Sequence, residues 1–128
     1  MTHAIRFESV GGPEVLTYQE VTLPPPGAGE ARVRHTAIGV NFIDIYYRTG
    51  LYKLPLPAGL GMEAAGVVES VGADVTRVAP GDRIAYASAP VGAYSEAANV
   101  AATRLVKLPD AVPDEIAAAA SSSAGVET

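Results

Sequence analysis

Glycine and proline punctuate this sequence so closely that only short strands and short helices fit between them. The 128 residues include thirteen glycines and ten prolines. Residues 4–9 alternate as a half-buried strand should, with Ile5 and Phe7 on one face and Arg6 and Glu8 on the other. Comparable stretches follow at residues 15–21, 30–38, 61–72, 83–87, 92–100 and 104–108. This pattern predicts a mainly β barrel or sandwich that carries two small helices.

Composition narrows the class of protein. A chain of 128 residues is long enough for one core and too short for two ordinary domains. Its net charge of −5 speaks against nucleic acid as a partner. The absence of cysteine excludes disulfides, zinc–thiolate sites and cysteine nucleophiles. With neither a secretory signal nor an apolar run of about 18–20 residues, we expect a soluble, cytoplasmic protein.

Residues 39–50 combine apolar bulk with two tyrosines, a carboxylate, an amide and an arginine. Asn41 is a suitable N-cap and Gly50 a suitable stop, so a short helix is predicted between them. Such a helix is apolar around most of its circumference, and we expect it to be buried or to await a ligand or a second domain. The alternative is an ordinary core helix with a solvated Asp44–Arg48 ion pair at i,i+4 spacing.

The remaining stretches give further expectations. Alternation fails near His35, which predicts a bulge. The small residues Ala64, Ala65 and Gly66 predict a backbone that another segment approaches closely. Residues 51–60 are predicted to form an irregular loop, and Pro113 to open a helix. Residues 1–120 are predicted to form the domain, and residues 121–128 an irregular tail or an artificial end.

Several short motifs occur together in one order along residues 3–120. They are Gly11-Gly12-Pro13-Glu14-Val15-Leu16, Gly39-Val40-Asn41-Phe42-Ile43-Asp44, Tyr46-Tyr47-Arg48-Thr49-Gly50-Leu51-Tyr52, Gly61-Met62-Glu63-Ala64-Ala65-Gly66, Pro80-Gly81-Asp82-Arg83, Gly92-Ala93-Tyr94 and Leu105-Val106-Lys107-Leu108-Pro109. This order resembles the catalytic domain of the medium-chain dehydrogenase/reductases, in particular their zinc-independent, ζ-crystallin-like quinone oxidoreductases. The resemblance implies a GroES-like, partly open barrel in residues 1–120.

Two positions separate this sequence from the zinc alcohol dehydrogenases it also resembles. Those enzymes carry a cysteine where this chain has Asn41 and a histidine where it has Met62. A catalytic zinc needs three nitrogen, sulfur or oxygen ligands, which an amide and a thioether do not supply. The resemblance therefore implies chemistry without a metal.

The resemblance also assigns residues to a site for NADPH and a quinone. It implies that Asn41, Tyr46 and Tyr52 orient the substrate, because tyrosine offers a flat ring and a hydroxyl donor. By similarity, the nicotinamide end of NADPH lies against Asn41, Phe42, Ile43, Asp44, Ile45 and Tyr46. Both tyrosines are equally compatible with ordinary packing.

Four other side chains are expected to be structural. Glu63 should pair with a nearby cation or a backbone donor, and Met62 should serve as packing. His35 should be a satisfied residue at an edge. Tyr94 should pack under the edge of the barrel.

The family's Rossmann domain, with its glycine-rich turn, is absent from this sequence. We therefore expect these residues alone to bind NADPH weakly or not at all, to show little or no turnover, and to be monomeric. The longer parent enzyme is expected to be a homodimer. Two alternatives stay open: a GroES-like binding module without catalysis, and an enoyl reductase domain.

Overall fold

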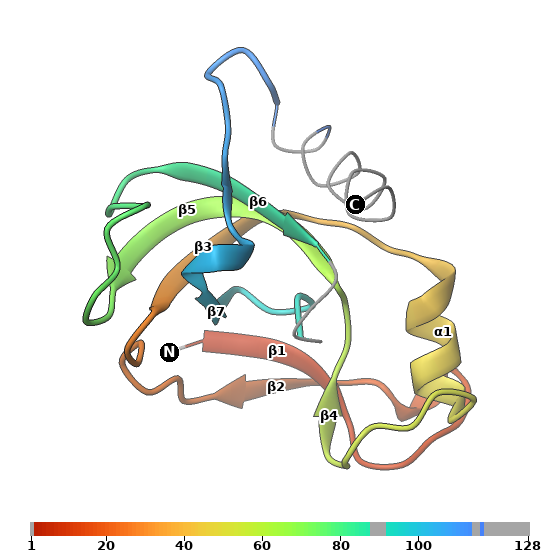
Figure 1. Cartoon of the computed structure of the whole chain (residues 1–128). Coiled ribbons are helices and arrows are strands. Elements are labelled where there is room, and N and C mark those ends of the chain that lie inside the picture. Colours follow the sequence, from red (N-terminus) through yellow and green to blue (C-terminus); the bar gives the residue numbers. More distant parts are fainter. Residues whose placement is uncertain (1, 88–91, 114–115, 117–128) are drawn as a thin grey trace.

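In the described part of the chain, two antiparallel sheets form the protein, and the short helix α1 lies at one end of them (Figure 1). The computed structural model describes residues 2–87, 92–113 and 116. The smaller sheet has the order β2-β1-β4 and the larger the order β7-β3-β5-β6-β8. The elements are β1 (Thr2–Phe7), η1 (Pro13–Val15), β2 (Thr17–Val21), β3 (Glu30–Ile38), α1 (Phe42–Thr49), β4 (Ala58–Gly59), β5 (Glu63–Val71), β6 (Arg83–Ala87), β7 (Ala97–Ala101), η2 (Ala102–Arg104) and β8 (Val106–Lys107).

The sheets meet where β1 runs beside the segment that leads into β7. Ile5 N donates to Tyr94 O at 2.8 Å, and Glu96 N donates to His3 O at 2.9 Å. Across the described residues the strands do not close into a complete ring. The predicted fold, mainly β and a partly open barrel, is confirmed. No helix in this part of the chain is long and apolar enough to cross a membrane.

The long central pair of strands, β3 and β5, confirms two local predictions. Their register shifts between His35 and Ala37, which is the predicted bulge. A Cβ added to Gly66 would overlap the carbonyl oxygen of Arg34 on β3. The backbone of β3 therefore approaches β5 as closely as the small residues Ala64, Ala65 and Gly66 predicted.

Some predicted boundaries were wrong because short turns take up the strand ends. The second strand begins at Thr17 rather than at residue 15, since Pro13–Val15 forms a 3₁₀ turn. The strand predicted at residues 92–100 is confined to Ala97–Ala101. The loop at residues 51–60 is irregular as predicted, except for the two residues of β4. The helix predicted to follow Pro113, the limit at residue 120 and the tail at 121–128 lie almost wholly outside the described residues.

A small apolar cluster fixes the position of α1 against the smaller sheet. Phe7, Ala58 and Leu60 are buried, and the rings of Tyr47 and Tyr94 pack against them. The turn that follows β1 also contacts the C-terminal end of the helix. There Gly11 N donates to Arg48 O at 3.0 Å, and Arg48 Nε donates to Gly11 O at 3.1 Å. The helix is therefore held at a fixed place on the sheet.

Substituting Gly66→Ala should lower the free energy of unfolding by about 1–3 kcal/mol, because the added methyl group overlaps the β3 backbone. Urea denaturation measures this change. Gly27→Ala is the matched control, since its added Cβ would meet only the flexible side chain of Glu30. Equal stability of the Gly66→Ala variant and the wild type would contradict the close approach of β3.

Candidate functional site

Helix α1 begins and ends at the residues that the sequence predicted. Asp44 N donates to the backbone oxygen of Asn41 at 3.0 Å, and Asp44 Oδ2 accepts a hydrogen bond from Asn41 N at 3.0 Å. The two residues thus have the arrangement of a capping box. At the other end, Gly50 adopts a left-handed conformation with φ 90°, which glycine tolerates best.

The face that α1 exposes distinguishes between the expectations. Its apolar side is open, with Phe42 79% exposed, and its only buried residue is Asp44. A buried helix was therefore wrong for this chain, whereas an open apolar side agrees with a helix that awaits a ligand or a second domain. A solvated Asp44–Arg48 ion pair was also wrong, because Arg48 donates to the Gly11 carbonyl and Asp44 lies underneath the helix.

Asp44 and Glu63 are buried under α1, and each carboxylate accepts a hydrogen bond from an uncharged side chain. Tyr94 donates its hydroxyl to Asp44 Oδ2 at 2.7 Å. Asn41 Nδ2 donates to Glu63 Oε1 at 2.8 Å. Both carboxylate residues are only 3% exposed, and Asp44 Oδ1 and Glu63 Oε2 have no hydrogen-bond partner among the described residues. Glu63 thus pairs with an amide, whereas the sequence predicted a cation or a backbone donor.

The environment of Tyr94 explains why its hydroxyl stays protonated. Burial raises the pKa of Tyr94, and the hydrogen bond to the Asp44 carboxylate raises it further. A neutral phenol keeps the proton that it donates to Asp44. The sequence predicted only a packing role for Tyr94, and no sequence signal links it to a residue fifty positions earlier.

Tyr46 and Tyr52, the predicted catalytic tyrosines, lie side by side at the C-terminal part of α1. Their ring centroids are 5.6 Å apart and nearly perpendicular, and Tyr47 makes a second edge contact with Tyr52. Their side chains are accessible, since Tyr46 is 40% and Tyr52 47% exposed. Asn41 lies at the opposite end of the same helix.

The remaining predicted cofactor residues follow the turns of this helix. Phe42 and Ile45 are exposed and Ile43 is half-buried. Asp44 is turned beneath the helix, where it accepts hydrogen bonds from Tyr94 and from the backbone of Asn41. The exposed face of α1 therefore offers apolar side chains and tyrosines, whereas its carboxylate supports the helix from below.

The half-buried His35 and the buried Tyr86 form a second hydrogen-bonded pair, on interior strands of the larger sheet. His35 Nδ1 lies 2.7 Å from Ser95 O, which can only accept, so Nδ1 carries the proton. Nε2 is then the acceptor for the Tyr86 hydroxyl at 2.8 Å. Burial lowers the pKa of His35, although the bond to Ser95 opposes that shift. His35 is satisfied, as predicted, but β3 is an interior strand rather than an edge.

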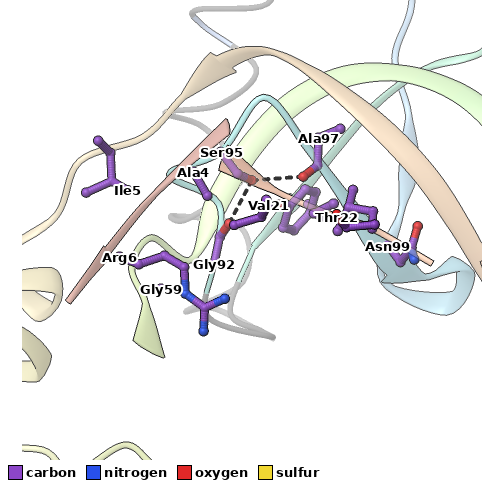
Figure 2. A pocket seen from close by; sticks show the side chains of 13 residues that line it. Ala4, Ile5, Arg6, Val21, Thr22, Gly59, Gly92, Ser95, Ala97 and Asn99 are labelled. Atoms are coloured by element: carbon purple, nitrogen blue, oxygen red, sulfur yellow. Dashed lines mark hydrogen bonds between the residues drawn. The ribbon is translucent and has the colours of Figure 1, made fainter. Parts of the chain in front are cut away.

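Two cavities lie away from the predicted site. One, of about 320 Å³, lies between β1, β2 and β7, and Ser95 Oγ there lies 2.9 Å from Gly92 O and 3.1 Å from Ala97 O (Figure 2). The other, of about 400 Å³, has walls that include His35 and Tyr94. None of the predicted site residues lines either cavity. Among the described residues, no cluster of three His, Asp or Glu side chains could hold a metal ion.

The free energy of unfolding should decrease as the pH falls below about 6.5, the ordinary pKa of histidine. The pKa of His35 is lower in the folded chain, so the unfolded chain binds the proton first and is favoured. Above that pH, His35 contributes no pH dependence. Urea denaturation at several pH values should show a smaller decrease for His35→Gln than for the wild type. Equal pH profiles for wild type and His35→Gln would contradict this assignment.

A double-mutant cycle should detect the Tyr94–Asp44 hydrogen bond. Tyr94→Phe and Asp44→Asn should each destabilise the fold, and their effects should fall short of additivity by about 1–2 kcal/mol, because each removes the same charged hydrogen bond. Urea denaturation of the four proteins gives the coupling energy. Tyr18→Phe, at an exposed tyrosine on β2, should change stability little. Strict additivity would show that the two side chains do not interact.

Comparison with known proteins places these features in a family. Residues 27–110 match the alcohol dehydrogenase GroES-like domain. The chain is 56% identical over 120 residues to a quinone oxidoreductase of Pseudomonas aeruginosa, covering 93% of this chain and 37% of that protein. It is also 42% identical over 114 residues to a 2-haloacrylate reductase of a Burkholderia species, covering 85% of this chain and 34% of that protein.

A solved structure of an Escherichia coli quinone oxidoreductase complexed with NADPH has the same fold. It superimposes with a TM-score of 0.89 at 48% identity, covering 93% of this chain and 36% of that chain. This chain thus spans a little over a third of the length of these relatives. It belongs to the alcohol dehydrogenase GroES-like domain family, and the resemblance to quinone oxidoreductases that its sequence predicted is confirmed.

Proposed function

We propose that this chain is the substrate-side domain of an NADPH-dependent quinone reductase that works without a metal. The observation that carries the proposal is the accessible pair of Tyr46, on α1, and Tyr52, three residues beyond its end, together with the exposed apolar side chains of Phe42 and Ile45 on the same helix. Exposed apolar patches of this kind commonly mark a site that another molecule covers. A flat, uncharged redox ring fits such a surface better than a charged substrate does.

The side chains of α1 match the needs of quinone reduction. A quinone is already electron-poor, so it can accept hydride without a Lewis acid; NADPH supplies that hydride when it is bound. The tyrosine rings would flank the quinone, and their hydroxyls would donate hydrogen bonds to the oxygen that gains negative charge. Phe42 and Ile45 would contact the nicotinamide end and exclude water from it.

Asn41 and Asp44 have different parts in this proposal. Asn41 would contact the ligand with its amide at the start of the helix. Asp44 would act from beneath, where its capping bond and its bond to Tyr94 keep the helix in place. The relatives support the overall proposal, since one is named a quinone oxidoreductase and another is solved with NADPH.

Most contacts to NADPH would come from a Rossmann domain, which is the principal proposed partner of this chain. Without it, we expect these residues to be monomeric, with weak or no cofactor binding and little or no turnover. Together with it, we expect a homodimeric enzyme of the cytoplasm.

A second reaction, reduction of an activated carbon–carbon double bond, is favoured by one observation. The Burkholderia relative is a 2-haloacrylate reductase. The same face of α1 could hold a planar enone or acrylate, because hydride transfer to such a substrate also places negative charge on a carbonyl oxygen. Quinones and acrylates therefore have to be compared as substrates in the same preparation.

The proposal can be tested in a hybrid enzyme. This chain's 120 matching residues would replace the corresponding segment of the Pseudomonas aeruginosa quinone oxidoreductase. The hybrid should reduce quinones with NADPH in the presence of a chelator. Tyr46→Phe combined with Tyr52→Phe should lower kcat about 100-fold, because both hydroxyl donors are removed. Stopped-flow absorbance of NADPH at several quinone concentrations separates kcat from KM.

Tyr18→Phe in the hybrid is the matched control, and its kcat should equal that of the unmodified hybrid. Three results would overturn the proposal: a folded hybrid that does not reduce quinones, activity that requires added zinc after chelation, or full activity without the two hydroxyls. Faster reduction of acrylates than of quinones would instead favour the second reaction.

A further inference from the structure

We infer that Glu63 is a positioning residue, whose buried carboxylate fixes the orientation of the Asn41 amide so that Asn41 serves its ligand as a hydrogen-bond donor. This inference rests on the proposed function for what the ligand is, a molecule with a carbonyl oxygen that becomes negative. The hydrogen bond between Glu63 and Asn41 does not depend on that function, so its effect on the Asn41 amide can be tested in this chain alone.

The Asn41 amide is oriented by a partner with only one possible role. Glu63 Oε1 accepts a hydrogen bond from Asn41 Nδ2 at 2.8 Å. A carboxylate oxygen can only accept, so a flipped amide would place its own oxygen against Glu63 and lose this bond. The Glu63 carboxylate therefore requires the orientation in which Nδ2 of Asn41 faces it.

This orientation decides what Asn41 can offer a ligand. A primary amide has two N–H donors, and only one of them is used by Glu63. Among the described residues, Glu63 is the one acceptor bonded to Nδ2, so the second Nδ2 proton is an unused donor on the half-buried residue that precedes α1. A preorganised N–H donor is the group that stabilises a developing oxyanion.

Gly39 leaves the space that the Glu63 side chain occupies. Glu63 is the first residue of β5, and Gly39 N donates to its carbonyl oxygen at 3.0 Å. A Cβ on Gly39 would overlap the Glu63 side chain. The φ angle of Gly39 is not positive, so glycine is needed there for space rather than for backbone conformation.

An ion pair does not explain this buried acid. In the part of the chain that the structure describes, no lysine, arginine or histidine forms a salt bridge with Glu63, and Asn41 is the one side chain bonded to its carboxylate. Burying a carboxylate without a cation is unfavourable for stability. Local arrangements that oppose stability are expected at functional sites.

The decisive experiment compares two replacements of Glu63. Glu63→Met removes the acceptor but keeps an unbranched side chain, whereas Glu63→Gln retains an oxygen that can accept from Asn41. In NMR spectra of the ¹⁵N-labelled protein, the resonance of the hydrogen-bonded Nδ2 proton of Asn41 should move upfield in Glu63→Met. The same proton should exchange faster with water in that variant. In Glu63→Gln it should stay close to the wild-type position.

The same variants in the hybrid enzyme report on catalysis. Glu63→Met should lower kcat about tenfold with little change in KM, because a misoriented donor weakens the transition state more than substrate binding. Glu63→Gln should restore most of that loss. The hybrid's own activity tests the proposed function separately from the role of Glu63.

Gly39→Ala provides a second variant in case Glu63→Met does not fold. Its methyl group displaces the unchanged carboxylate, so the Asn41 signal and kcat should respond as in Glu63→Met. Gly27→Ala is the matched control and should alter neither. An Asn41 signal that is the same in wild type, Glu63→Met and Gly39→Ala would overturn the inference. So would equal kcat values for Glu63→Met and Glu63→Gln in an active hybrid.

Discussion

The buried carboxylate of Asp44 is the interaction on which the placement of α1 depends. It receives the backbone N–H of Asn41 from the start of the helix and the hydroxyl of Tyr94 from a segment fifty residues later in the chain. One side chain thus caps the helix and attaches it to the sheets. Since a buried carboxylate without donors is strongly unfavourable, the helix can hardly rotate away from Tyr94. This fixes which face of α1 is left open.

The open face reverses the ordinary arrangement of an amphipathic helix. A helix on a sheet normally turns its apolar side inward, yet α1 buries its acidic residue and exposes Phe42, Ile45 and Tyr46. Among the described residues, three buried side-chain oxygens have no hydrogen-bond partner, and two of them, Asp44 Oδ1 and Glu63 Oε2, lie under this helix, whereas Asn99 Oδ1 lies on β7. The main core is built of well-buried Val, Ile, Leu and Ala with Tyr86. Two unfavourable features thus coincide at α1, and such local departures are expected at functional sites.

Glycines make this arrangement possible by leaving room for side chains from other segments. A Cβ at Gly39 would overlap the Glu63 carboxylate, and one at Gly61 would meet the ring of Tyr94. Gly61 also has φ +96°, so both its conformation and its contacts require glycine. Asn41, Glu63 and Tyr94 can therefore meet under α1 only because their neighbours are small.

The sequence by itself determined the elements and the family. Period-two alternation located most strands, the cap residues Asn41 and Gly50 set the helix, and the failed alternation near His35 located the bulge, because each is a local property of a few adjacent residues. The order of short motifs indicated the GroES-like domain. Strand ends were less predictable, because the 3₁₀ turn of Pro13–Val15 includes Val15, which the sequence predicted as the first residue of the second strand.

Only the tertiary structure decided how the candidate site is assembled. The pairing of Asn41 with Glu63 spans 22 positions and that of Asp44 with Tyr94 spans 50, and no local pattern specifies such contacts. The same is true of the face that α1 exposes, since helical periodicity gives the relative positions of side chains but not the direction of the core. The helix alone would favour burying Phe42 and Ile45. Asp44 is buried instead, because Tyr94 donates a hydrogen bond to it and Glu63 of β5 accepts one from the neighbouring Asn41.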